Sequence, residues 1–175
     1  MRQYSTGYII GFAALVCLVC SIVVSSSAVS LRPLQLENKE LDRQKQVLRV
    51  AGLLEEGEAA DAAKIKQLFD ESIDPRAVEL STGVYDESVD PTTYDQQKAL
   101  KDPESSRRAD PNNAGVQRVP NKAVVYHKIV DGELEMLILP IEGKGLWSTL
   151  YGFIALAPDL TTIEGITFYQ HGETP

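Results

Sequence analysis

The residues best suited to bind a ligand lie between Glu142 and Pro175. Glycines flank the single tryptophan of the chain, Trp147, and a polar cluster follows at residues 171–174. A tryptophan beside glycines can present a flat apolar face to a ligand, while nearby backbone N–H groups and the hydroxyls of Ser148 or Thr149 supply hydrogen bonds. The pattern indicates a site for a flat ligand. The alternative is a core tryptophan that covers a sheet.

The other polar candidates keep two interpretations each. His171 is either a ligand-binding residue or a turn residue, and residues 173–175 form either a plain turn or a loop that places a hydroxyl and a carboxylate beside a ligand. His127 falls within an expected strand, where we expect a surface or edge residue rather than a ligand.

Most signatures of catalysis are absent. Gly143-Lys144-Gly145 lacks the upstream glycine and the hydroxyl residue of a phosphate loop, and Ser148 replaces the third glycine of a dinucleotide fingerprint. No nucleophile, base and orienting group can be assembled, which disfavours a hydrolytic enzyme. Cys17 and Cys20 lie in an apolar segment without a second ligand pair, so we expect no metal site and no catalytic residue.

The charge balance argues against nucleic acid as a partner. Of 17 Lys plus Arg and 25 Asp plus Glu, only Arg2 lies within residues 1–31, so the remainder carries 16 basic and 25 acidic residues, a net charge of −9. An acidic domain repels phosphate backbones and anionic lipid headgroups.

Residues 1–31 are expected to form a transmembrane anchor. No charged residue follows Arg2 in this segment, and about 20 apolar residues cross a ~30 Å hydrocarbon core as a helix. A cleaved signal peptide ending near Ala28 is the alternative, but its apolar region is usually only about 7–15 residues long. The basic residues that follow the helix favour a cytoplasmic domain, although long domains translocate largely regardless of charge.

Residues 32–58 are expected to form a stalk helix and linker. The helix should continue the membrane span after a distortion at Pro33 and end at Gly52. Leu34, Leu41 and Leu48 recur every seven residues and form one narrow apolar stripe on an otherwise solvated helix. A coiled-coil dimer is the alternative, although three leucines do not sustain the required heptads.

Residues 59–175 are expected to form one soluble domain of the α+β class. The pattern predicts a short helix at 59–71, a turn at 73–76 that leads into a brief strand, and a long polar insertion at about 86–120. A hairpin around Asp131-Gly132 and strands at 153–157 and 163–170 then build an antiparallel sheet.

The whole chain resembles the C subunit of the bacterial sodium-translocating NADH:quinone reductase. The resemblance rests on the order and spacing of four segments: LVCSIVVSSSAVSLRPLQLENKELDRQKQVLRVAGL, FDESIDPR, ILPIEGKGLWSTLYGFIAL and YQHGETP. It implies a single-pass protein of the bacterial inner membrane with a periplasmic FMN-binding domain that passes electrons, beside other subunits of a sodium-pumping respiratory complex. The apolar segment offers no charged sodium ligand, so other subunits are expected to move the ion.

The resemblance also implies cofactor contacts at Gly145, Leu146, Trp147, Ser148, Glu173 and Thr174. In the family, FMN is attached through its phosphate to a threonine in a Ser-Gly-Ala-Thr motif. Residues 81–84, Ser-Thr-Gly-Val, do not replace that motif, so the attachment threonine is expected beyond Pro175 in a chain that is incomplete at its carboxyl end and inactive alone. The alternatives are the paralogous flavin subunit of the ion-pumping ferredoxin:NAD oxidoreductase and a cofactor-free, membrane-tethered adaptor.

Overall fold

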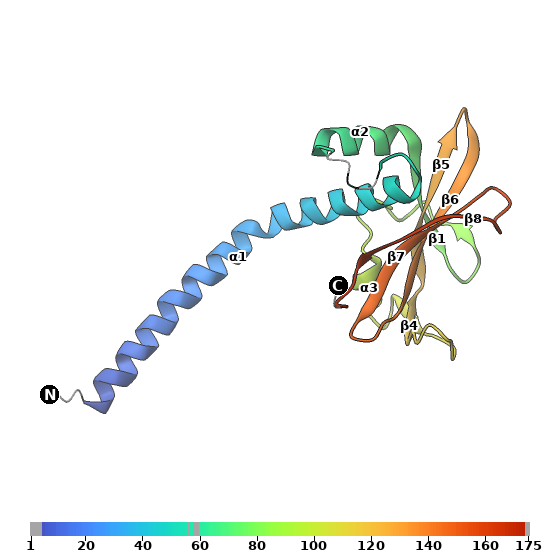
Figure 1. The fold of residues 1–175 in the computed structure, drawn as a ribbon. Coiled ribbons are helices and arrows are strands. Elements are labelled where there is room, and N and C mark those ends of the chain that lie inside the picture. Colours follow the sequence, from blue (N-terminus) through green and yellow to red (C-terminus); the bar gives the residue numbers. More distant parts are fainter. Residues whose placement is uncertain (1–4, 56, 58–59, 174–175) are drawn as a thin grey trace. The chain divides into compact units, whose positions relative to one another are not determined.

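The structure is a computed structural model that describes residues 5–55, 57 and 60–173. The chain divides into two compact units, residues 1–40 and residues 41–175, and each is described separately. Figure 1 shows the long helix α1, the shorter helices α2 and α3, and the strands of the sheet domain.

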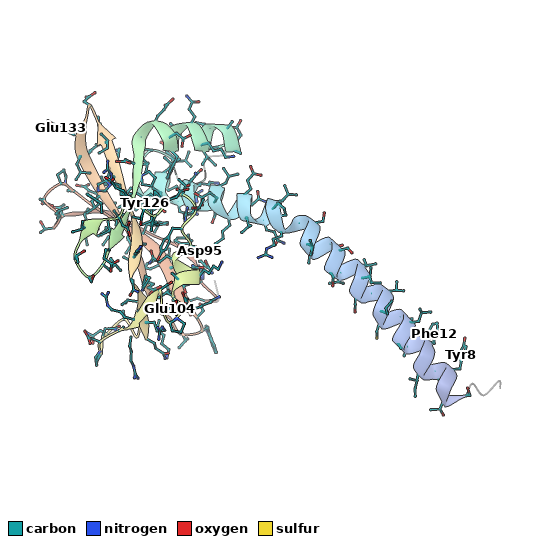
Figure 2. All side chains as sticks on the ribbon, turned by 180° about the vertical axis from the view of Figure 1, so that it is seen from behind. Tyr8, Phe12, Asp95, Glu104, Tyr126 and Glu133 are labelled. Atoms are coloured by element: carbon teal, nitrogen blue, oxygen red, sulfur yellow. The ribbon has the colours of Figure 1, made fainter. Side chains whose placement is uncertain are left out.

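The helix α1, Thr6–Val50, begins in the first unit and continues into the second. Pro33 lies inside this helix. Although proline has no N–H donor, the helix continues beyond the position where a distortion was expected. Tyr8 and Phe12 lie one turn apart, with ring centroids separated by 6.5 Å (Figure 2). Among the described residues, α1 is the one helix long and apolar enough to cross a membrane.

The last turns of α1 belong to the core of the sheet domain. Val47 and Leu48 are fully buried, and Val50 is nearly so. The expectation of a solvated stalk is therefore wrong for these turns, because apolar side chains on more than one side of the helix are covered. The helix ends at Val50, and the predicted stop residue Gly52 follows it with φ of +70°. Hydrogen bonds from Gly52 N to Arg49 O (3.0 Å) and from Leu53 N to Leu48 O (2.9 Å) close this end.

The helix α2, Ala62–Ser72, leads directly into strand β1, Ile73–Glu79. Asp61 caps α2 by accepting a hydrogen bond from Lys64 N (2.8 Å), while residues 58–59 lie outside the described residues. The expected turn at 73–76 is wrong, since these residues pair with β5. Pro75 is tolerated because β2 pairs only with the end of β1, which leaves the other side of Pro75 without a strand partner.

The domain is built on a six-stranded antiparallel sheet, which confirms the α+β class. The spatial order is β2-β1-β5-β6-β7-β8, in which the last four strands form a meander. The remaining bounds are β2 Val84–Tyr85, β5 Lys122–Val130, β6 Glu133–Lys144, β7 Thr149–Leu156 and β8 Ile163–Gln170. The predicted β5–β6 hairpin is present, with φ of 52° at Asp131 and 82° at Gly132, as a two-residue type I′ turn requires.

One face of the sheet packs on the helices through a row of aromatic rings. Tyr126 lies within this core (Figure 2), with its ring centroid 6.1 Å from that of Phe69 on α2 and 5.7 Å from that of Phe153 on β7. Tyr169 on β8 stacks on Phe153 at 5.0 Å. The row joins α2 to the far edge strand, so the core spans most of the sheet.

The polar insertion at 86–120 is more ordered than its composition predicts. It contains α3, Gln96–Ala99, and a small hairpin of β3, Ser106–Arg108, and β4, Arg118–Pro120. Acidic side chains accept hydrogen bonds from backbone N–H groups two residues further on, as Asp86 does from Ser88 (2.9 Å) and Asp90 from Thr92 (2.9 Å). These local turns fix the insertion without an apolar core of its own.

The core predicts a large effect of truncation at Ile138, a fully buried residue of β6. We expect Ile138→Ala to lower the free energy of unfolding by about 2–5 kcal/mol, because it removes buried methyl groups and leaves a cavity. Urea denaturation of the full chain in detergent measures this. Ile166→Ala is the control because Ile166 is 56% exposed on β8. Equal losses in both variants would contradict the assigned core.

Candidate functional site

A cleft of about 460 Å³ opens where the β6–β7 hairpin meets the insertion. Its walls are the carboxyl end of β6, the loop 145–148, the start of β7, and residues 115–118 with Leu100 from the insertion. Lys144 N donates a hydrogen bond to Ala114 O (2.7 Å), which ties the end of β6 to the insertion. The cleft is thus formed by segments that are distant in the sequence.

The four predicted residues Gly145, Leu146, Trp147 and Ser148 all line this cleft. Leu146 is 82% exposed and Trp147 is 72% exposed. The alternative of a core tryptophan that covers the sheet is therefore wrong, and a large aromatic surface remains available to a ligand.

Glu173 lies against the same loop. Its carboxylate accepts hydrogen bonds from Trp147 N (3.1 Å to Oε1 and 3.3 Å to Oε2) and from Ser148 N (3.1 Å). Ser148 Oγ in turn accepts a hydrogen bond from Gly172 N (2.6 Å). The structure therefore joins the predicted segments 145–148 and 172–173, which precede β7 and follow β8 and so meet at the open end of the β7–β8 hairpin.

Gly145 permits this close approach. A Cβ atom at this position would overlap Glu173 Oε1 and lie 3.0 Å from Ser148 O, which accepts a hydrogen bond from Gly145 N. Thr174, the remaining predicted contact, lies outside the described residues, and His171 is exposed.

Charged residues that sequence reasoning did not select also line the cleft. Lys144 ends β6, and Arg118 is fixed by hydrogen bonds from Nε to Ser106 Oγ (2.9 Å) and from Nη2 to Ser106 O (2.9 Å). Two cations in one cleft of an acidic chain favour an anionic ligand. The sequence signal was weak because Arg118 lies in a polar insertion and Lys144 does not have phosphate-loop spacing.

Glu142 brings a carboxyl group into the same cleft. It is half-buried and pairs with Tyr151 across β6 and β7. Burial raises the pKa of Glu142, and burial together with the nearby Glu142 charge raises the pKa of Tyr151. The cleft wall therefore holds a carboxyl group that favours its neutral form more than an exposed glutamate does.

His127 corrects a sequence-based expectation. It is only 8% exposed, with Nε2 at 3.0 Å from the Tyr85 hydroxyl and Nδ1 at 3.3 Å from Asp74 O. The short edge strand β2 brings Tyr85 over the imidazole, so His127 is a hydrogen-bonded buried residue and not a surface one. Among the described residues, no group of three or more His, Cys, Asp or Glu side chains is placed to bind a metal.

Comparison with known proteins finds relatives that share one subunit name. It is 46% identical to the C subunit of the Na(+)-translocating NADH-quinone reductase of Pseudomonas aeruginosa, over 99% of this chain and 67% of the relative, and 43% identical to that of Vibrio alginolyticus, over 97% and 63%. The crystal structure of Shewanella oneidensis NqrC matches with a TM-score of 0.70 at 33% identity, over 79% of this chain and 63% of that one. No family model matches the chain.

The fold and cleft define a class of protein with one amino-terminal apolar helix and an α+β domain that carries a ligand-sized cleft. The chain belongs to the family formed by the C subunits of Na(+)-translocating NADH-quinone reductases. It spans about two thirds of the length of these relatives, at 67%, 63% and 62% for the first three. The apolar helix and the membrane-complex relatives together support a membrane-anchored protein.

The environment of Glu142 predicts a pH-dependent effect on stability. Because its pKa is raised in the fold, its contribution is greatest below the ordinary glutamate pKa and is lost as pH rises through the folded value. We expect Glu142→Gln to have a higher Tm than wild type at pH 7–8 and no such advantage at pH 4. Thermal unfolding monitored by circular dichroism measures this, with Glu133→Gln at the exposed start of β6 as control. An advantage that does not change with pH would contradict the assignment.

Proposed function

We propose that this chain forms part of an FMN-binding electron-transfer subunit of a sodium-translocating NADH:quinone reductase. The family membership supports the complex, and the exposed Trp147 at the cleft is the observation that carries the cofactor assignment. The partners are the other subunits of the complex and the membrane lipid around residues 1–31. Among the residues that the structure describes, we expect no catalytic residue and no group placed to bind a metal, and we propose that the chain alone is inactive.

The cleft has the size and chemistry that FMN requires. Its volume of about 460 Å³ falls within the range of roughly 300–1,000 Å³ that is typical of cofactor pockets. The indole of Trp147 and the side chain of Leu146 offer an apolar wall for the isoalloxazine ring, and Arg118 and Lys144 suit a phosphate. The residues present therefore fit the group.

The chain's own residues would bind, orient and desolvate the cofactor. FMN supplies one-electron chemistry when bound, and the protein sets its environment. Leu146 and Trp147 would exclude water from one side of the ring, and the hydroxyls of Ser148 and Thr149 line the cleft beside them. Thr174 is proposed as a further polar contact. The contacts proposed here between FMN and the residues of the cleft wall are noncovalent.

We also propose that the domain faces the periplasm, with the anchor in the bacterial inner membrane. The family resemblance supports this orientation, and long domains translocate largely regardless of the basic residues beside their anchor. Alkaline phosphatase fused after Pro175 should be active in cells, because this enzyme folds only after export. An inactive but stably produced fusion would contradict the orientation.

The cofactor assignment predicts that FMN binding depends on Trp147. Because Trp147 is the only tryptophan, addition of FMN to the full chain in detergent should quench its fluorescence directly. Trp147→Leu keeps an apolar side chain but removes the ring, and we expect an affinity about three- to tenfold lower, as measured by flavin fluorescence anisotropy.

Phe168→Leu is the matched control, since Phe168 is an aromatic residue 48% exposed on β8 and is not among the residues of the cleft wall. Equal affinities of Trp147→Leu and Phe168→Leu would contradict a site at Trp147. Absence of FMN binding by wild type would favour the cofactor-free adaptor instead.

A further inference from the structure

The segment that follows β8 is attached to the cleft loop by a built set of hydrogen bonds. The Glu173 carboxylate accepts from the backbone N–H groups of Trp147 and Ser148, and Ser148 Oγ lies 3.5 Å from Glu173 Oε1. A carboxylate that accepts several backbone N–H bonds is an acceptor in the strong, charge-assisted class. The loop N–H groups therefore already have a partner within the chain.

Two further hydrogen bonds stabilise the loop 145–148 and its contact with the segment after β8. Gly145 N donates to Ser148 O (2.7 Å), and Gly172 N donates to Ser148 Oγ (2.6 Å). Gly172 is itself close to Ser148, since a Cβ there would lie 3.2 Å from both Ser148 Cβ and Oγ. Ser148 is thus held from both sides, by its own loop and by the segment after β8.

The two side chains in the middle of the loop 145–148 are exposed and apolar. Leu146 and Trp147 lie between the two ends of the clamped loop and are 82% and 72% exposed. Exposed apolar side chains gain nothing from burial in their own domain. Their placement at the cleft therefore depends on the backbone of residues 145–148, and that backbone is held by Glu173.

We infer that Glu173 is a positioning residue, which holds Leu146 and Trp147 at the cleft wall through the backbone N–H groups of their loop and does not itself touch the cofactor. The inference deepens the proposed function and rests on it for the identity of the ligand. It gives the glutamate of the Glu-Thr segment a different role from direct cofactor contact.

The acidity of Glu173 agrees with this geometry. Desolvation raises the pKa of Glu173, but hydrogen bonds from the backbone N–H groups of Trp147, Ser148 and Leu146 outweigh it, so the pKa is lowered below the ordinary glutamate value. Protonation of the carboxylate at low pH should therefore release the loop. The other titratable groups of the cleft wall are Glu142, Lys144, Arg118 and Tyr151, and His171 lies in the same segment.

The test compares Glu173→Gln with Glu164→Gln, which removes the same charge from an exposed position on β8. In protein without FMN, we expect only Glu173→Gln to shift the NMR amide signals of Trp147 and Ser148 and to change quenching of tryptophan fluorescence by acrylamide. In wild type, the same two amides should titrate together at a pH below the ordinary glutamate pKa. With FMN added, Glu173→Gln should bind about tenfold more weakly or worse, which corresponds to the loss of one hydrogen bond to a charged group.

Gly145→Ala provides a second test that keeps the carboxylate. Its Cβ would displace Glu173 Oε1, so it should reproduce the amide shifts and the weaker FMN binding while the circular dichroism spectrum and Tm stay close to those of Glu164→Gln. Unchanged Trp147 signals in both Glu173→Gln and Gly145→Ala would overturn the inference. Changed Trp147 signals with unchanged FMN affinity would overturn it as well. If wild type does not bind FMN, the proposed function fails. The NMR and fluorescence signals measured without FMN still test whether Glu173 holds the loop 145–148.

Discussion

The structure depends on the burial of the last turns of α1 against the sheet. Val47 and Leu48 are completely removed from solvent, and Val50 reaches the backbone of β8. Gly165 favours that approach, because a Cβ at this position would make a tight contact of 3.1 Å with Val50 O. The helix α1 therefore begins as an exposed apolar segment, and its last turns are buried in the core of the sheet domain.

This packing explains why the cleft lies at the end of the β6–β7 hairpin. The helices and the aromatic row of Phe69, Tyr126 and Phe153 stabilise the middle of the sheet, while the hairpin extends beyond them toward the insertion. The loop 145–148 thus receives little support from the apolar core. Polar contacts replace that support: the Glu173 carboxylate, the Ser148 hydroxyl and the bond from Lys144 N to Ala114 O. A rigid scaffold with a polar, locally fixed loop is a common arrangement for binding sites.

Local sequence signals predicted those features that depend on local chemistry. Gly52 ended α1 and Asp131-Gly132 formed the hairpin turn, because positive φ at these positions follows from residue type. The prediction of a turn at 73–76 was wrong because proline usually interrupts a strand. Pro75 has a strand partner on one side only, and such a position tolerates a residue without an N–H donor. The burial of His127 could not be predicted, since it depends on Tyr85, 42 residues away in sequence.

The sequence selected the loop 145–148 and Glu173 as candidate residues, but it did not predict the contacts between them. The glycines and Trp147 marked the loop, and the structure brings it together with Glu173. Neither spacing nor composition could show that the carboxylate would face backbone N–H groups, because that contact joins residues 26 positions apart. Arg118 and Glu142 were missed for a similar reason, since one lies in a polar insertion and the other has an ordinary place in a strand.

Nuclear Overhauser effects between bound FMN and the full chain test the central claim most directly, because they locate the isoalloxazine ring against individual side chains. A cofactor site at Trp147 predicts contacts from the ring protons to the indole of Trp147, to the methyl groups of Leu146 and to Leu100 across the cleft. Contacts instead to Ile166 and Phe168, which are exposed on β8, would contradict it.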